Sequence, residues 1–247
     1  MKTFTKLLKN ELNLNIRDMN MVIFAIIMPL VLLLILGILY QSRAAFEGAD
    51  YTFLEQSMGA LCTISICAGG LMGLPILVSE YRERKILKRL QVTPISPILL
   101  LSVEFVIYVL YALVSMLLLF LIGRVFWGIT IRGNFIAFIG SWFLTLVSNL
   151  SIGMMIGGIA KNAKIASVIA SALYFPMLIF SGATLPFEVM PVVMQKIVLL
   201  FPLSQGIQLM KAASLGLPMD DLWVPVAIMV FVTLICSGIA VTCFKWE

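Results

Sequence analysis

The sequence contains no histidine, and only 12% of its residues are charged. Without histidine, serine or cysteine nucleophiles lack their usual base, and the common histidine-containing zinc sites are excluded. The chain has no GxxxxGK[ST] loop, so it cannot hold ATP as P-loop ATPases do. None of the four cysteines forms a CxxC pair, and no pair of carboxylates lies inside an apolar run. We therefore expect no catalytic residue, metal or cofactor in this chain.

Apolar residues dominate what is present. Hydrophobic residues make up 62% of the chain and the mean hydropathy is +1.09, whereas a soluble domain is about 45–50% apolar. These values predict an integral membrane protein, so the net charge of +5 does not indicate nucleic-acid binding. Six apolar stretches, the fifth of them short, predict an all-α chain with a single transmembrane domain over 1–247: about Met21–Tyr40, Met58–Val78, Ile98–Ile122, Phe135–Ala160, Ile165–Ser181 and Leu222–Phe244.

Lysine and arginine are concentrated in alternate connections between these stretches. They gather in the N-terminal tail, in the second-to-third and fourth-to-fifth connections, and at the C-terminus. Since positive charge is retained in the cytoplasm, this distribution predicts that both termini are cytoplasmic. We expect a multi-pass protein of the cell membrane, in a bacterium.

The first 20 residues have the pattern of an amphipathic helix. Apolar side chains fall on one helical face and basic side chains on the other, which is typical of an interfacial helix that contacts anionic lipid headgroups. A simple positively charged anchor is the alternative. The apolar face consists of Phe4, Leu7, Leu8, Leu12 and Ile16.

A charged segment over 80–95 separates the second and third stretches. The spacing of Glu80 and Arg84 favours a helix, Pro94 ends it, and Ser96 with Pro97 provides the start of the next helix. The segment is too polar for the membrane interior, so we expect a cytoplasmic helix that binds a soluble partner. Its candidate contact residues are Glu80, Arg82, Glu83, Arg84, Lys88 and Arg89.

Residues 182–221 are neither a plain loop nor a plain span. Pro186, Pro191 and Pro202 divide the segment, and the pieces Val192–Phe201 and Leu203–Leu215 are too short to cross a membrane. Irregular backbone at membrane depth survives only when protein or a water-filled cavity surrounds it. The pattern predicts short re-entrant helices that enter from the outer face.

Glu104 is the ionisable residue that lies well inside a predicted span. Ionisable groups at such a depth are costly and are functional candidates by default. Three interpretations remain open: pairing with Lys88, Arg89 or Arg17, a conformational or substrate-contact role, and proton coupling.

Two motifs resemble the permeases of type-2 ABC exporters. The run from Ser79 to Ser96 is similar to their pattern E-R-E-x-G-T-L-x-x-L-x-x-T-P-[LI]-S, and the prolines after the fifth span are similar to a second signature. This chain departs from the pattern at Lys85 and Ile86, where Gly-Thr is common, and at Glu104, where lysine is expected.

The resemblance implies a mechanism. Two permeases, identical or different, would pair, and each would bind a cytoplasmic ATPase subunit that holds ATP and magnesium. The charged residues over 80–95 would couple ATPase closure to the spans, and an outer gate would include Pro186, Pro191, Pro202 and Leu203. A substrate path would follow the second and fifth spans, lined by Met58, Thr63, Met72, Ser167, Ser171, Tyr174 and Phe175.

The uncharged character of that path favours an amphipathic substrate, such as a drug, an antimicrobial peptide or a lipid-like molecule. Export of a lipid-linked polysaccharide is an alternative by the same mechanism. Two other classes also stay open: a proton-coupled secondary transporter that uses Glu104, and a non-transporting membrane tether for a cytoplasmic partner.

Overall fold

The computed structural model describes residues 2–17, 19–40, 43–46, 48–86, 96–180, 201–218 and 223–243. These residues form helices joined by short connections, with an isolated bridge between Ala44 and Thr52. The helices, in chain order, are α1 (Lys2–Arg17), α2 (Met19–Val22), η1 (Ile23–Ile27), α3 (Met28–Tyr40), α4 (Phe53–Cys67), η2 (Ala68–Gly73), α5 (Leu74–Glu83), α7 (Pro97–Trp127), α8 (Phe135–Ile159), α9 (Ala163–Phe180), α11 (Pro202–Leu215) and α12 (Trp223–Cys243).

Five helical runs of the described chain are long and apolar enough to cross a membrane. They are Met19–Tyr40, Phe53–Glu83, Ile98–Trp127, Phe135–Ile159 and Trp223–Thr242. The fifth predicted span coincides with α9, which is apolar but has only 18 residues. A helix of that length rises about 27 Å, slightly less than the hydrocarbon core. The all-α membrane fold is therefore confirmed, and the sixth crossing stays a prediction.

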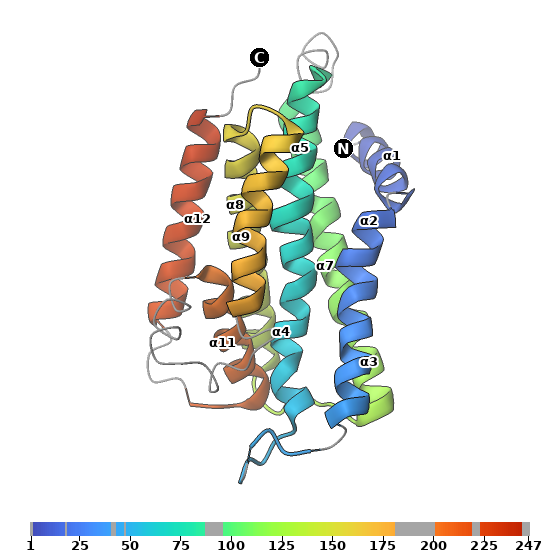
Figure 1. Cartoon of the computed structure of the whole chain (residues 1–247), viewed down its shortest axis with the longest axis vertical. Coiled ribbons are helices and arrows are strands. Elements are labelled where there is room, and N and C mark those ends of the chain that lie inside the picture. The colour runs from blue at the N-terminus through green and yellow to red at the C-terminus, as the bar shows by residue number, and fades with distance from the viewer. Residues whose placement is uncertain are drawn as a thin grey trace.

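The span formed by α4, η2 and α5 lies in the middle of the bundle (Figure 1). Glycines let its backbone approach α8 closely: Gly70 faces Asn149 and Gly153, and Gly157 packs against Val78. A side chain at Gly153 would collide with the carbonyl of Gly70. These contacts agree with the close helix packing that small residues at a spacing of four favour in membranes.

Prolines in the first two spans each follow a π-helix. Pro29 follows η1, where the Met28 amide bonds the carbonyl of Ile23, and Pro75 follows η2, where the Leu74 amide bonds the carbonyl of Gly69. A proline ring clashes with the carbonyl four residues earlier in an α-helix. The wider π-helical turn moves that carbonyl away, so both spans continue past their prolines.

Helix α11 belongs to the predicted re-entrant segment. It contains 14 residues, corresponding to about 21 Å, which is too short to cross a membrane. It packs near the end of the bundle opposite to the end of α5 (Figure 1). Most of its residues are buried, and Gly206 lies against Thr145 of α8. The start of α11 matches the predicted piece Leu203–Leu215, whereas residues 181–200 lie outside the described chain.

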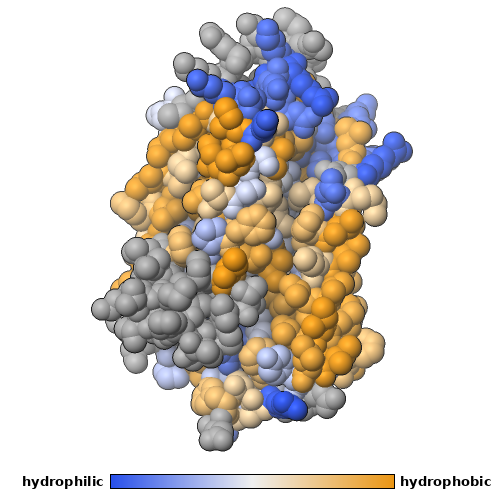
Figure 2. All heavy atoms as spheres, in the orientation of Figure 1, coloured by the Kyte–Doolittle hydropathy of each residue, from blue (hydrophilic) through white to orange (hydrophobic). Residues whose placement is uncertain are grey.

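Polar side chains gather near one end of the molecule. Figure 2 shows hydrophilic residues at the end that holds α1 and the end of α5, above a broad apolar surface. In α1 the predicted apolar residues Phe4, Leu7, Leu8 and Leu12 pack against the core. Ile16 is the exception, since it is 52% exposed. The amphipathic pattern is thus confirmed except at Ile16.

Candidate functional site

A cavity of about 470 Å³ lies between the first span and α9. Its walls come from the first span (α2, η1 and α3), the middle of the second span, Tyr108 of α7 and the C-terminal half of α9. Phe24, Tyr108, Tyr174 and Phe175 supply aromatic rings, and three methionines supply thioethers. The lining is therefore mainly apolar and adaptable, as small-molecule sites usually are.

The cavity has polar groups at one end. Asn15 at the end of α1, Asn20 of α2 and Glu80 of α5 contribute amide and carboxylate groups to its lining. A ligand with an apolar body and a polar head would find partners for both parts. Within the described chain, no group of three or more cysteine, aspartate or glutamate residues could hold a metal ion.

The predicted path residues fall into two groups. Met72, Tyr174 and Phe175 line the cavity, and the Ser171 hydroxyl lies 3.9 Å from the Met72 sulfur. Ser167 is half-buried on α9. Met58 and Thr63 are buried inside the bundle, where the Thr63 hydroxyl donates to the carbonyl of Ala60 at 2.6 Å.

Glu104 is fully buried beside the polar end of the cavity. Its carboxylate accepts hydrogen bonds from the Tyr81 hydroxyl at 3.0 Å and from the Asn15 amide at 3.3 Å. The Tyr81 hydroxyl is also 3.4 Å from a carboxylate oxygen of Glu11. Glu104 of α7 thus links α1 to α5 through neutral donors. Of the expected cationic partners, Arg17 is exposed, and Lys88 and Arg89 lie outside the described residues.

The charged residues at the end of α5 make two kinds of contact: Arg82 and Glu83 bind backbone groups of α8 and α9, and Glu80 pairs with Arg84. Arg82 donates hydrogen bonds from Nη1 to the carbonyls of Gly157, Gly158 and Ala160, at the end of α8. Glu83 accepts the backbone amide of Ala163, the first residue of α9, at 3.1 Å.

Glu80 and Arg84 form an ion pair of 2.7 Å, with side chains 36% and 69% exposed respectively. Of the six residues predicted to contact a soluble partner, Arg82 and Glu83 thus bind their own chain, Glu80 also lines the cavity, and Arg84 is exposed. Lys88 and Arg89 lie beyond the described residues.

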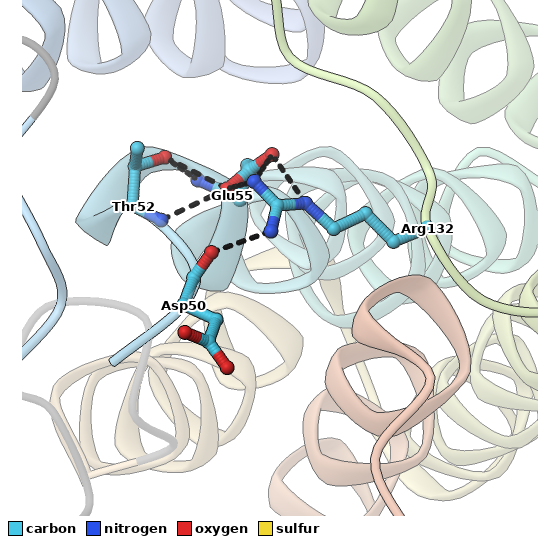
Figure 3. Close-up of polar contacts among 4 residues, drawn as sticks. All are labelled: Asp50, Thr52, Glu55 and Arg132. Carbon is cyan, nitrogen blue, oxygen red and sulfur yellow. Dashed lines mark hydrogen bonds and ion pairs between the residues drawn. The ribbon is translucent and has the colours of Figure 1, made fainter. Parts of the chain in front are cut away.

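A second polar cluster, at the opposite end of the bundle, was not predicted from the sequence (Figure 3). Thr52 and Glu55 form a capping box at the start of α4. Arg132, in the connection between α7 and α8, donates to both Glu55 oxygens at 3.2 and 3.1 Å and to the carbonyl of Asp50. The Thr-x-x-Glu motif that marks a capping box is visible in the sequence, but its arginine partner is not.

The second polar cluster continues into α11 through the backbone. The amides of Arg132 and Gly133 both donate to the carbonyl of Ser214, at 2.9 and 3.0 Å. A side chain at Gly133 would collide with the backbone of Ala213 and Gly216. The end of α11 is therefore fixed to the same connection that binds the start of α4.

Comparison with known families identifies the chain. The family model for the ABC-2 type transporter matches residues 2–215, which include α1 to α11 and every wall of the cavity. The chain belongs to the ABC-2 type transporter family. The resemblance found in the sequence is thereby confirmed, and the chain is a multi-pass membrane component of a transporter. Nodulation protein J of Neorhizobium galegae is 32% identical over 79 residues, which are 32% of this chain and 30% of that protein.

The position at which this ABC-2 chain departs from the expected glycine has an unusual backbone. Helix α5 ends at Glu83, Arg84 is its C-cap, and Lys85 has a φ of 55°. The left-handed region favours glycine because a β-carbon there approaches the backbone. The charged segment was predicted as one helix that Pro94 ends. The prediction of an unbroken helix is wrong, since the helix of the second span ends at Glu83, and residues 87–95 lie outside the described chain. The glycine of the family pattern matches this break.

Proposed function

We propose that this chain is the membrane subunit of an ATP-driven exporter. Two such subunits pair in the cell membrane, each with a soluble ATPase subunit that binds ATP and magnesium. Closure of the ATPase subunits switches the pair between inward-facing and outward-facing states. The observation that carries this proposal is the apolar, aromatic cavity beside a charged helix end, in a chain of the ABC-2 family.

The cavity supports an amphipathic substrate, such as a drug, an antimicrobial peptide or a lipid-like molecule. Aromatic rings and methionines suit a large apolar body of variable shape, and the amides of Asn15 and Asn20 suit a polar head. Export of a lipid-linked polysaccharide remains the alternative substrate class.

The edge of the cavity supports a paired assembly. Phe24, Met28 and Phe175 line the cavity, yet they are 49%, 41% and 55% exposed. A second subunit, identical or homologous, would cover these side chains and close the substrate path between the two. Met58 and Thr63 are buried in the bundle and would join that path only after the second span moves.

Arg84 supports an ATPase contact. Its side chain is 69% exposed at the end of the second span, where it pairs with Glu80 and where a soluble subunit would bind. Charged contacts at the rim of an interface mainly set encounter rate and specificity. Such a contact can break and re-form in every cycle. Lys88 and Arg89 belong to the same proposed surface.

Helix α11 is the proposed outer gate. Pro202 and Leu203 begin this helix and are buried, and the helix packs between α4 and α8. Together with the segment that contains Pro186 and Pro191, it would close the outer end of the path. With α11 at the outer face, the opposite end of the bundle and both termini would be cytoplasmic.

The test is purification of the native assembly from its own membrane, followed by ATPase measurement in lipid. Arg84→Glu places a like charge beside Glu80 and should reduce the retained ATPase subunit several-fold. Arg124→Glu, an exposed reversal at the opposite end of α7, is the matched control and should retain it. A chain that purifies without any ATPase subunit, even after cross-linking, would overturn the proposal and favour a tether or a secondary transporter.

The secondary-transporter alternative would use Glu104 as its proton carrier, so dependence on a proton gradient distinguishes it from the exporter. The hydrogen bonds of Glu104 to α1 and α5 favour a role in joining helices. An exporter driven by ATP should continue to transport when the proton gradient is collapsed and ATP is held constant. A proton-coupled carrier should stop under those conditions.

A further inference from the structure

We infer that Arg82 and Glu83 are positioning residues that join α5, α8 and α9 into one unit, so that displacement of the charged end of α5 moves the α9 wall of the cavity. The inference rests on the proposed function, since an ATPase subunit would supply the displacement. It assigns these two residues a task inside the membrane subunit itself, distinct from contact with the partner.

We call the contacts of Arg82 and Glu83 with α8 and α9 the clamp. The first half of the clamp is at the end of α8. The last carbonyls of an α-helix have no donor within the helix, and a cation is favourable at this negative end of the helix dipole. Arg82 Nη1 lies 3.1 Å from the Gly157 oxygen, 2.7 Å from that of Gly158 and 3.0 Å from that of Ala160. One side chain of α5 thus binds three carbonyls at the end of α8.

The second half is at the start of α9. Asn162 caps this helix through the Ile165 amide at 2.8 Å, and the Glu83 carboxylate accepts the Ala163 amide at 3.1 Å. An anion is favourable at the positive end of the helix dipole. Adjacent residues of α5, with opposite charges, therefore bind the end of one helix and the start of the next across the short turn at 160–162.

Close packing makes the clamp stiff. Gly157 approaches Val78 so closely that a β-carbon at position 157 would lie 2.8 Å from the Val78 β-carbon. The Ser79 hydroxyl also lies 3.5 Å from the Gly157 carbonyl oxygen. With so little space between the two backbones, α5 cannot slide or rotate without moving the end of α8.

The clamp connects to the cavity along α9. Tyr174 and Phe175 lie on this helix about 17 Å from Ala163, and both line the cavity. The facing wall, with Phe24 and Met28, belongs to the first span, which the clamp does not bind. Movement of α5 and α9 as one unit relative to the first span would change the width of the cavity.

The test measures a distance across the cavity in the ATPase-bound complex in lipid nanodiscs. The native cysteines are replaced, and spin labels are placed at Val168→Cys on α9 and Ile38→Cys on α3, two positions that are 64% and 71% exposed. Pulsed electron paramagnetic resonance then compares the nucleotide-free complex with the ADP–vanadate complex. We expect vanadate to shift this distance when Arg82 and Glu83 are intact.

The variants distinguish loss of coupled movement between α5 and α9 from a general loss of stability. Glu83→Ala and Arg82→Ala should reduce the vanadate shift to less than half. Glu83→Gln, which keeps an acceptor oxygen, and Arg82→Lys, which keeps a cation, should restore most of it. Lys164→Ala, which removes an exposed cation from the first turn of α9, is the matched control and should keep the full shift.

The outcomes distinguish this inference from the proposed function. Failure of any ATPase subunit to bind the unaltered protein would overturn the proposed function. If the ATPase subunit binds and turns over, but the clamp variants shift as the unaltered protein does, the clamp inference is wrong and the exporter proposal stands. If the unaltered complex shows no vanadate-induced shift of the distance, the clamp inference is likewise wrong and the exporter proposal stands. Should Arg82→Ala not fold, Glu83→Ala decides alone, because it leaves the α8 contacts intact.

Discussion

Arg132 binds both carboxylate oxygens of Glu55, a residue 77 positions earlier in the chain. The Glu55 side chain is only 7% exposed, whereas that of Arg132 is 46% exposed. The pair joins the start of α4 to the connection between α7 and α8, and the backbone of that connection binds the end of α11. The connection between α7 and α8 thus fixes α4 and α11 together at the end of the bundle opposite to the end of α5.

Arg132→Ala should lower the free energy of unfolding by about 1–2 kcal/mol. The buried Glu55 carboxylate would lose two charge-assisted hydrogen bonds, but Thr52 would still bind it, and the exposure of Arg132 limits the loss. Denaturation of the purified protein in detergent measures the change. Arg43→Ala, which removes an exposed arginine from the neighbouring connection, is the control and should have an effect within about 0.5 kcal/mol. Equal effects of the two variants would show that the pair of Arg132 and Glu55 does not stabilise the bundle.

Lys85→Gly should stabilise the protein by about 1 kcal/mol, because it relieves a left-handed backbone at a side-chain-bearing residue. Lys85→Val should destabilise it, since a β-branched side chain is still less compatible with φ 55°. The same denaturation measurement tests both. The opposite order of the two variants would show that the charge of Lys85 matters more than its backbone.

The sequence alone predicted the parts of the fold that depend on local pattern. Apolar length located five of the six predicted spans, and Ser96 caps α7, where its hydroxyl accepts the Leu99 amide at 3.2 Å. The predicted amphipathic pattern of α1 is also confirmed for most of its apolar face, which packs against the core. These features depend on residues within a few turns of one another, so they can be predicted without knowledge of the packing.

Contacts between distant segments could not be predicted in the same way. The partners of Arg82 are carbonyls 75 to 78 residues away, and no side-chain type marks a carbonyl acceptor in a sequence. The sequence left three roles open for Glu104 and did not indicate that packing would bring Asn15 and Tyr81 to it as hydrogen-bond donors. The capping box at Thr52 was visible, yet only the fold shows that Arg132 reaches it.

Tyr81→Phe should loosen the attachment of α1 to the bundle. The variant removes the hydroxyl that contacts Glu11 of α1 and bonds Glu104, and it leaves the apolar ring in place. Loss of one hydrogen bond costs about 1 kcal/mol, so amide exchange in α1 should become about fivefold faster. Hydrogen exchange with mass spectrometry measures this change peptide by peptide.

Tyr40→Phe is the control for that experiment. Tyr40 stacks on Phe53 at the opposite end of the bundle, and the variant keeps this ring contact. Amide exchange in α1 should stay unchanged. Unaltered exchange in Tyr81→Phe as well would show that apolar packing by Phe4, Leu7 and Leu8 fixes α1 without help from the Tyr81 hydroxyl.

Cysteines placed at Phe24 and Phe175 should report on occupation of the cavity. Both side chains line the cavity and are partly exposed, so a thiol reagent should reach them, whereas native Cys62, Cys67 and Cys236 are buried. Cys243 is replaced to lower the background. An amphipathic ligand should slow labelling at both sites several-fold, because it would occupy the space that the reagent must enter. Val125→Cys, 70% exposed at the outer end of α7, should label at the same rate with and without the ligand. If protection occurs at Phe175→Cys but not at Phe24→Cys, the ligand lies along α9, and the first span does not form the opposite wall of its site.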